Sequence, residues 1–201
     1  MTEKDVVIDN YFAAGNTFYD KNSNMNVVKI ISGNYYVSNQ PNDVLVTILG
    51  SCISACIRDP KAKIGGMNHF LLPGDNTNDS ARFGAYAMEI LINEIMKKGG
   101  RKERLEVKLF GGANIIQSNL SKIGDKNVEF IREYIEKEKL NVLTEDLGGT
   151  SPRRIHYYPH TGKVMMKKVQ EEEDKKVIAE ERNYVTKLTK ETKSDGDIEL
   201  F

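Results

Sequence analysis

Cys52 and His69 are the residues whose types and spacing are best suited to covalent chemistry in this chain. Cys52 follows Gly50-Ser51 at the end of one apolar run, and His69 lies in the next apolar run. The thiolate of a cysteine is the nucleophile, and a free cysteine with a pKa of about 8.5 is only a few per cent ionised at neutral pH. A neighbouring histidine can take the thiol proton. The pair therefore indicates nucleophilic catalysis by a thiol.

Each of these residues also has a structural interpretation. Free cysteines are among the most buried residues, and Cys56, inside an alternating apolar run, is expected to be a core residue. The position of Cys52 after a Gly-Ser turn favours catalysis, with the backbone amides around Ser51 and Ile53 as candidate donors to an oxyanion. Thr47 could orient the imidazole through its hydroxyl, although a β-branched residue is also ordinary in a strand.

The elements that must position these residues are short β-rich runs separated by turn signals. Strands are expected at 27–33, 34–39, 44–50, 52–58 and 64–72. The sequence Asp59-Pro60-Lys61-Ala62 predicts a turn between the last two. A hairpin that turns near residue 61 places Cys52 opposite His69, which is what a contact between thiol and imidazole requires.

The rest of the chain predicts an α+β domain with hairpin-type rather than βαβ connections. Apolar residues recur at helical spacing, and capping and stop signals bound helices at about 80–98 and 125–139. Further strands are expected at 104–110, 141–147, 153–158 and 164–169. We divide the chain into a polar N-terminal extension (1–26), one domain (27–170) and a charged amphipathic C-terminal helix with a tail (171–201).

Composition excludes several classes of protein. The chain has 201 residues, and its 29 basic and 29 acidic residues cancel, so no net charge draws it to nucleic acid or to an anionic membrane. No apolar run approaches the roughly 18–20 residues of a membrane span, and the N-terminus lacks the apolar core of a signal peptide. Its two cysteines form no disulfide framework. We expect a cytoplasmic protein with free thiols.

A metal site is a weaker interpretation of the same residues. Cys52, Cys56, His156 and His160 offer two thiols and two imidazoles. However, the distance between the two pairs falls outside compact zinc-finger spacing, and Pro159 prevents the histidines from sharing one helix face. We expect no metal and no cofactor.

Two further motifs carry less information. Gly111-Gly112 lacks the Lys-Ser/Thr of a P-loop. Arg153-Arg154 could bind an anion or a partner carboxylate, or simply flank a strand.

Several segments together resemble the CheD family of chemoreceptor glutamine deamidases: LGSCISACIRDP, GGMNHFLLP, RFGAYAMEILINEI, KLFGGAN and GGTSPRRIHYYPHTGKV. The resemblance implies hydrolysis of glutamine side-chain amides in methyl-accepting chemotaxis receptors, which yields glutamates. It implies that Cys52 is the nucleophile, His69 the general base and Thr47 the residue that orients the base. It also implies a layered fold with two sheets, similar to deamidating toxin domains, and a CheC-type CheY-phosphate phosphatase as a partner.

Other functions remain open at this level. One is a chemotaxis adaptor that binds receptor or CheC with little turnover, and another is a different thiol hydrolase, such as a receptor methylesterase. A structural zinc protein comes last. For a protein substrate, the rim of the site is expected at the polar loop 74–80 and at 148–154.

Overall fold

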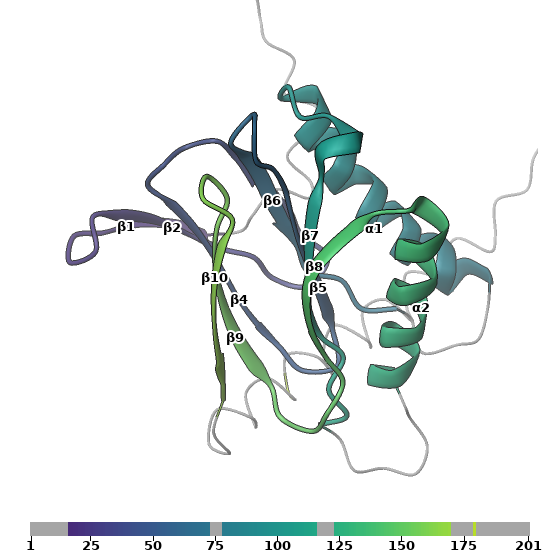
Figure 1. Cartoon of the computed structure of the whole chain (residues 1–201). Coiled ribbons are helices and arrows are strands. Elements are labelled where there is room, and N and C mark those ends of the chain that lie inside the picture. Colours follow the sequence, from purple (N-terminus) through teal and green to yellow (C-terminus); the bar gives the residue numbers. More distant parts are fainter. Residues whose placement is uncertain (1–15, 73–77, 116–122, 170–178, 180–201) are drawn as a thin grey trace, which may run out of the picture.

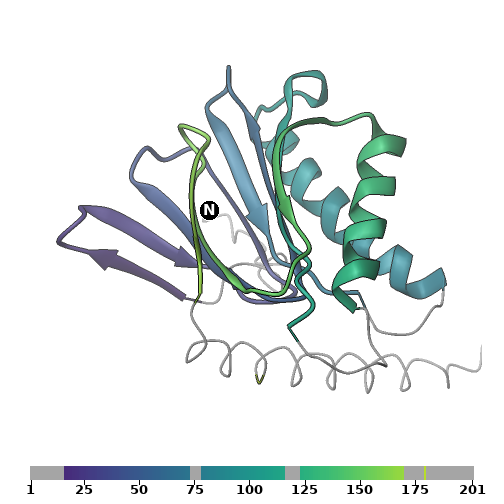
Figure 2. The same cartoon turned by 60° about the horizontal axis from the view of Figure 1, so that its bottom comes forward.

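The computed structural model describes residues 16–72, 78–115, 123–169 and 179. Its elements form three layers: an outer sheet, a central sheet and a pair of helices (Figure 1). Turning the molecule shows the two helices on one side of the central sheet and the outer sheet on the other (Figure 2). The central sheet is therefore covered on both faces.

The outer sheet has the strand order β1-β2-β4-β9-β10. Its strands are β1 (Asn16–Asp20), β2 (Met25–Lys29), β4 (Asp43–Leu49), β9 (Arg153–Tyr158) and β10 (Lys163–Lys168). All neighbours are antiparallel except β2 and β4, which run parallel.

The central sheet has the order β3-β6-β5-β7-β8. Its strands are β3 (Tyr35–Ser38), β6 (Ile64–Asn68), β5 (Ile53–Asp59), β7 (Glu106–Gly111) and β8 (Asn141–Leu147). The helices are α1 (Asn78–Lys97) and α2 (Ile123–Glu138), and a short 3-10 helix, η1 (Lys102–Arg104), precedes β7. Strands β7 and β8 run parallel with α2 between them, which is a βαβ connection.

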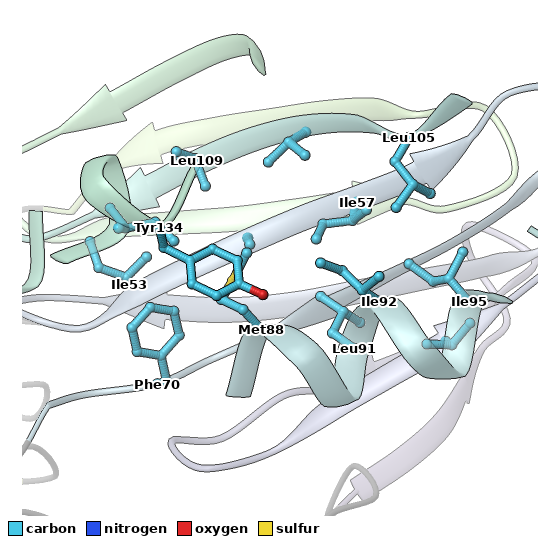
Figure 3. Packing of buried hydrophobic residues seen from close by; sticks show 14 of the residues in the cluster. Ile53, Ile57, Phe70, Met88, Leu91, Ile92, Ile95, Leu105, Leu109 and Tyr134 are labelled. Carbon is cyan, nitrogen blue, oxygen red and sulfur yellow. The ribbon is translucent and has the colours of Figure 1, made fainter. Parts of the chain in front are cut away.

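Two hydrophobic clusters fill the spaces between the layers. The larger lies between the central sheet and the helices, where Ile53, Phe70 and Leu91 pack together (Figure 3). The second lies between the sheets and contains Leu45, Leu49, Leu71 and both cysteines, among other residues. Alternation along a strand explains the division, because successive side chains point to opposite faces. Ile53 thus faces the helices, while the adjacent Cys52 faces the outer sheet.

The α+β class with two sheets is confirmed, and most strands lie within a few residues of their expected positions. Two expectations about the elements and their connections are wrong. The connections are not all of hairpin type, because β7-α2-β8 is a βαβ unit. In addition, β1 lies inside what was expected to be a polar extension over 1–26, where it pairs with β2. Apart from residue 179, the expected C-terminal helix and tail fall outside the described residues. Within the described residues, no helix is long and apolar enough to cross a membrane.

The predicted hairpin register is wrong by two residues. Ile53 pairs with Phe70, so Cys52 lies opposite Leu71 and His69 is its diagonal neighbour. Diagonal neighbours in a sheet are about 7–8 Å apart and remain within reach of long side chains. Because a shift of two equals the strand repeat, Cys52 and His69 still share one face.

Candidate active site

Cys52 lies where the chain passes from one sheet to the other. Strand β4 of the outer sheet ends at Leu49, and β5 of the central sheet begins at Ile53. The three residues between them, 50–52, connect the two sheets and include the cysteine. Cys52 has no exposed surface and belongs to the cluster between the sheets. The candidate nucleophile is therefore held in a buried turn between two rigid elements.

The end of β7 and the two residues after it hold this turn by hydrogen bonds and close packing. The amides of Gly112 and Ala113 donate to the carbonyls of Cys52 and Gly50, each at 2.8 Å. Gly111 has a φ of +113°, and a Cβ at this position would lie 2.0 Å from the carbonyl oxygen of Cys52. Only glycine fits there. The glycine pair is thus required for the close approach of β7 to the cysteine turn, a role that the sequence did not reveal.

His69 is oriented by Thr47 from the opposite sheet. The Thr47 hydroxyl donates to the carbonyl of Ile30 at 2.8 Å, and its oxygen lies 2.9 Å from Nδ1 of His69. A hydroxyl has one hydrogen, and here the carbonyl takes it, so the Thr47 oxygen accepts the hydrogen bond from Nδ1–H. The neutral imidazole then carries its lone pair on Nε2. This is the tautomer that a general base needs if Nε2 receives the proton.

The other nitrogen of His69 has no partner. Nε2 is buried and makes no hydrogen bond, although the residue is only 7% exposed. Burial lowers the pKa of His69 to about 4, while the Ile30 carbonyl opposes this shift. The imidazole is therefore neutral at pH 7. An unpaired acceptor in a buried position is costly, and such groups concentrate at functional sites.

The two cysteines belong to the same buried cluster but have different surroundings. Ser32 Oγ lies 3.8 Å from Sγ of Cys52. Cys56 is 1% exposed, and burial raises its pKa far above the ordinary value, which leaves an unreactive thiol. The prediction that Cys56 is a core residue is confirmed.

Asn127 links the two segments that carry the candidate catalytic residues. It is fully buried on α2, and its Nδ2 donates to the carbonyls of Ser51 (3.1 Å) and Ile123 (2.8 Å). Its Oδ1 accepts from the amide of Leu72 at 2.9 Å. One side chain therefore connects the residue before Cys52 to the segment that follows His69. A polar residue on the core-facing side of an amphipathic helix is the signal that could have revealed it.

One of the two expected oxyanion donors is already engaged in the sheet. The amide of Ile53 donates to the Phe70 carbonyl at 2.9 Å, and the reciprocal bond is also 2.9 Å. This amide is committed to the sheet and is not available to an oxyanion in this arrangement. The amide of Ser51 stays a prediction.

One of the two segments expected to form the rim, 148–154, lies close to the cysteine turn, and its role as a rim stays a prediction. The amide of Gly148 donates to the carbonyl of Gly111, and the carbonyl of Gly149 accepts from the amide of Asn114. These two bonds place the loop beside the end of β7, which contacts the cysteine turn. Arg153 forms a partly buried ion pair with Asp146 and also donates to the Gly148 carbonyl, so it holds the loop in place. Residues 73–77 of the other expected loop lie outside the described residues.

The four residues considered for zinc do not converge. Cys52 and Cys56 face the space between the sheets, whereas His156 alternates with the buried Ile155 and lies on the other face of its strand. Nδ1 of His160 lies 3.2 Å from the Asn39 carbonyl. Among the described residues, no three His, Cys, Asp or Glu side chains gather where they could hold a metal ion.

Comparison with known proteins gives consistent matches. The family model described as CheD chemotactic sensory transduction matches residues 71–168. A "Probable chemoreceptor glutamine deamidase CheD" of Hahella chejuensis is 47% identical over 198 residues, which cover 95% of this chain and 92% of the relative. The protein of the same name in Methylobacillus flagellatus is 45% identical over 196 residues, with 94% and 96% covered.

Solved structures give only a distant likeness. The Bacillus licheniformis hypothetical protein YfiH has a TM-score of 0.39 and 12% identity, and the match covers 56% of this chain and 49% of that one. A score this low carries no inference about function.

Proposed function

The chain belongs to the CheD family, and on that premise we propose that it is a protein-glutamine deamidase of bacterial chemotaxis that converts glutamines of methyl-accepting chemotaxis receptors to glutamates. One observation carries the catalytic part of the proposal. The Thr47 hydroxyl, whose hydrogen goes to Ile30, fixes the His69 tautomer and leaves a buried, unpaired Nε2 on the face that holds Cys52. Cys52 is the nucleophile, His69 is the base and Thr47 positions the base.

The first half of the reaction forms a thioester. Nε2 of His69 takes the proton of the Cys52 thiol, and the sulfur attacks the carbon of the glutamine amide. The C–S bond forms while the carbonyl electron pair moves to oxygen. When the tetrahedral intermediate collapses, the C–N bond breaks, and the proton on His69 passes to the leaving nitrogen. Ammonia departs and the acyl group remains on Cys52.

The second half uses water in place of the thiol. His69 Nε2 takes a proton from the water, and the hydroxide oxygen attacks the thioester carbon. Collapse breaks the C–S bond, releases the glutamate side chain and returns the proton to the sulfur. One base thus serves both halves, provided that Thr47 keeps Nε2 free between them.

Burial of the nucleophile sets a condition on the substrate. Cys52 has no exposed surface, so atoms that cover it must move before an amide carbon can reach the sulfur. A receptor that carries its glutamine on a helix can supply the binding energy for this movement. We place the docking surface for the receptor at the loop around Gly148 and Gly149, beside the end of β7 that contacts the cysteine turn.

The proposal is tested by mass spectrometry of a receptor cytoplasmic fragment incubated with the wild-type protein, Cys52→Ala or Cys56→Ala. Cys56 is the matched control because it is the other cysteine of the same buried cluster, on the strand that Cys52 precedes. We expect a gain of about one dalton at specific glutamines with the wild type and with Cys56→Ala. Cys52→Ala should give none. Deamidation by Cys52→Ala at the wild-type rate would contradict the assignment.

The proposal also covers the protein's location in the cell and a second binding partner. We place the protein in the cytoplasm, where the signalling tips of receptors lie, and propose a CheC-type phosphatase as a second partner. If the fragment binds without any mass change, the adaptor function replaces the enzymatic one.

A further inference from the structure

The connection between β2 and β3 contacts all three proposed catalytic residues. We call residues 30–34 the crossover segment, because it carries the chain from the outer sheet to the central sheet. Its Ile30 carbonyl accepts the Thr47 hydroxyl. The amide of Gly33 donates to the carbonyl of His69 at 2.7 Å, and the amide of His69 donates to Asn34 at 2.9 Å. The segment is therefore fixed relative to the base and its orienting residue.

The crossover segment presents Ser32 through a tight turn. The amide of Asn34 donates to the carbonyl of Ile31 at 3.0 Å, and Gly33 has a φ of +88°. A positive φ at the third position of a four-residue turn is typical of type II, which places Ser32 at the second position. Its hydroxyl oxygen lies 3.8 Å from Sγ of Cys52, in a partly buried position.

We propose that Ser32 is a further catalytic residue, whose hydroxyl donates a hydrogen bond to the sulfur of Cys52 and stabilises the thiolate. This inference rests on the proposed role of Cys52 as the nucleophile. In the thiol form either group can donate to the other, but a thiolate can only accept. Ionisation of Cys52 therefore fixes the direction of this hydrogen bond.

The surroundings of Cys52 give this hydrogen bond its importance. The sulfur lies in a cluster whose members include Leu45, Leu49 and Leu71. When His69 takes the thiol proton, a negative charge forms among these apolar side chains, where an uncompensated charge is costly. A hydrogen bond to a charged acceptor is shorter and about twice as strong as a neutral one. Ser32 thus favours the charged form over the resting thiol.

The contact predicts a measurable change in thiol reactivity. Alkylation by iodoacetamide consumes the thiolate, so its rate plotted against pH reports the ionisation of Cys52. The measurement uses the full chain with Cys56→Ala, so that one thiol remains. In this background, Ser32→Ala should move the midpoint of the profile upward by roughly 0.5–1 pH unit, as the loss of one hydrogen bond implies. Ser32→Thr keeps a hydroxyl and should restore most of the difference.

A neighbouring variant supplies the control. Ile31 belongs to the same turn, is 46% exposed and is not a member of the buried cluster that contains Cys52. Ile31→Ala should therefore leave the alkylation profile unchanged. On receptor fragment, Ser32→Ala should lower kcat about 3- to 10-fold with little change in KM.

The possible outcomes separate the two proposals. An unchanged alkylation profile in Ser32→Ala overturns the role of Ser32, even where deamidation slows, because the hydroxyl then acts on something other than the thiolate. An equal shift in Ile31→Ala also overturns it, since the turn and not the hydroxyl would be responsible. Absence of deamidation by the wild type overturns the proposed function alone, because the alkylation profile needs no receptor.

Discussion

The β5–β6 hairpin carries a buried ionisable side chain near each end, Asp59 beside its turn and His69 where its strands separate. Asp59 is fully buried, and its carboxylate accepts hydrogen bonds from the amides of Lys61, Ala62 and Arg101 and from the guanidinium of Arg104. His69 is almost as buried, but its Nε2 has no hydrogen-bond partner. The two ends of the hairpin thus differ. The carboxylate of Asp59 accepts several hydrogen bonds, whereas His69 has one nitrogen with no hydrogen-bond partner.

The difference separates a structural group from a chemical one. Burial alone would raise the pKa of Asp59, but the hydrogen bonds from Arg104, Ala62, Arg101 and Lys61 outweigh it and hold the pKa well below its usual range. The burial of His69 is opposed only by the Ile30 carbonyl, which does not outweigh it, so the pKa of His69 falls. Asp59 is a permanent charge that joins the hairpin to η1. His69 is a neutral base with an open position.

The largest expected effect comes from removing the base without removing its hydrogen bond to Thr47. The side-chain amide of His69→Asn can still donate to the Thr47 hydroxyl, but it offers no basic nitrogen. We expect deamidation of receptor fragment to fall by about 10²–10⁴-fold. The free energy of unfolding, measured by urea denaturation, should change by less than about 1 kcal/mol. A large loss of stability with activity retained would mean that His69 is a structural residue.

The opposite result is expected at the other end of the hairpin. Asp59→Asn removes the charge that Arg104 faces and leaves a buried cluster of donors partly unpaired, at a cost of about 2–4 kcal/mol of stability at pH 7. The wild-type advantage should shrink with acid, because a lowered pKa stabilises the fold fully above pH of about 4 and progressively less below it. Urea denaturation at pH 7 and pH 3 measures both effects.

Activity distinguishes this variant from those at the site. Per folded molecule, Asp59→Asn should deamidate at nearly the wild-type rate. A loss of activity as large as that of His69→Asn would show that the two ends of the hairpin are not separable.

Replacing Thr47 should give the smallest of the three changes when each is expressed as a free energy. Thr47→Val keeps the shape of the side chain but removes the hydroxyl between Ile30 and His69. The imidazole can then adopt the unproductive tautomer, and we expect kcat to fall about 10-fold while KM changes little. Thr47→Ser should recover most of the rate. If the serine variant is as slow as the valine variant, Thr47 contributes by packing and not by its hydroxyl.

Local patterns in the sequence predicted most of this end of the molecule. The strands, the turn at Asp59-Pro60 and the shared face of Cys52 and His69 follow from alternation and turn residues. The register was wrong by two residues, yet the face was right because a strand repeats every two residues. Thr47 was chosen partly by resemblance to a family, and its contact with His69 across the sheets supports that choice.

The remaining parts depend on contacts between distant segments. Ser32, Asn127 and Gly111 all act on residues that local pattern cannot pair with them, because strand order in the two sheets decides which segments meet. The β1–β2 hairpin was missed for another reason. Its Asn-rich sequence is typical of a loop, and only pairing of β2 with β4 places it in a sheet.

The most direct test of the account is the protonation state of His69, measured by nitrogen NMR on protein labelled at histidine. The chain has three histidines, so the single variants His156→Gln and His160→Gln assign the signals. The account predicts that at pH 7 His69 is neutral, with its proton on Nδ1 and none on Nε2, and that it titrates only near pH 4. A proton on Nε2 at pH 7, or a titration at pH of about 6.5, would contradict the claim that this buried nitrogen is the base.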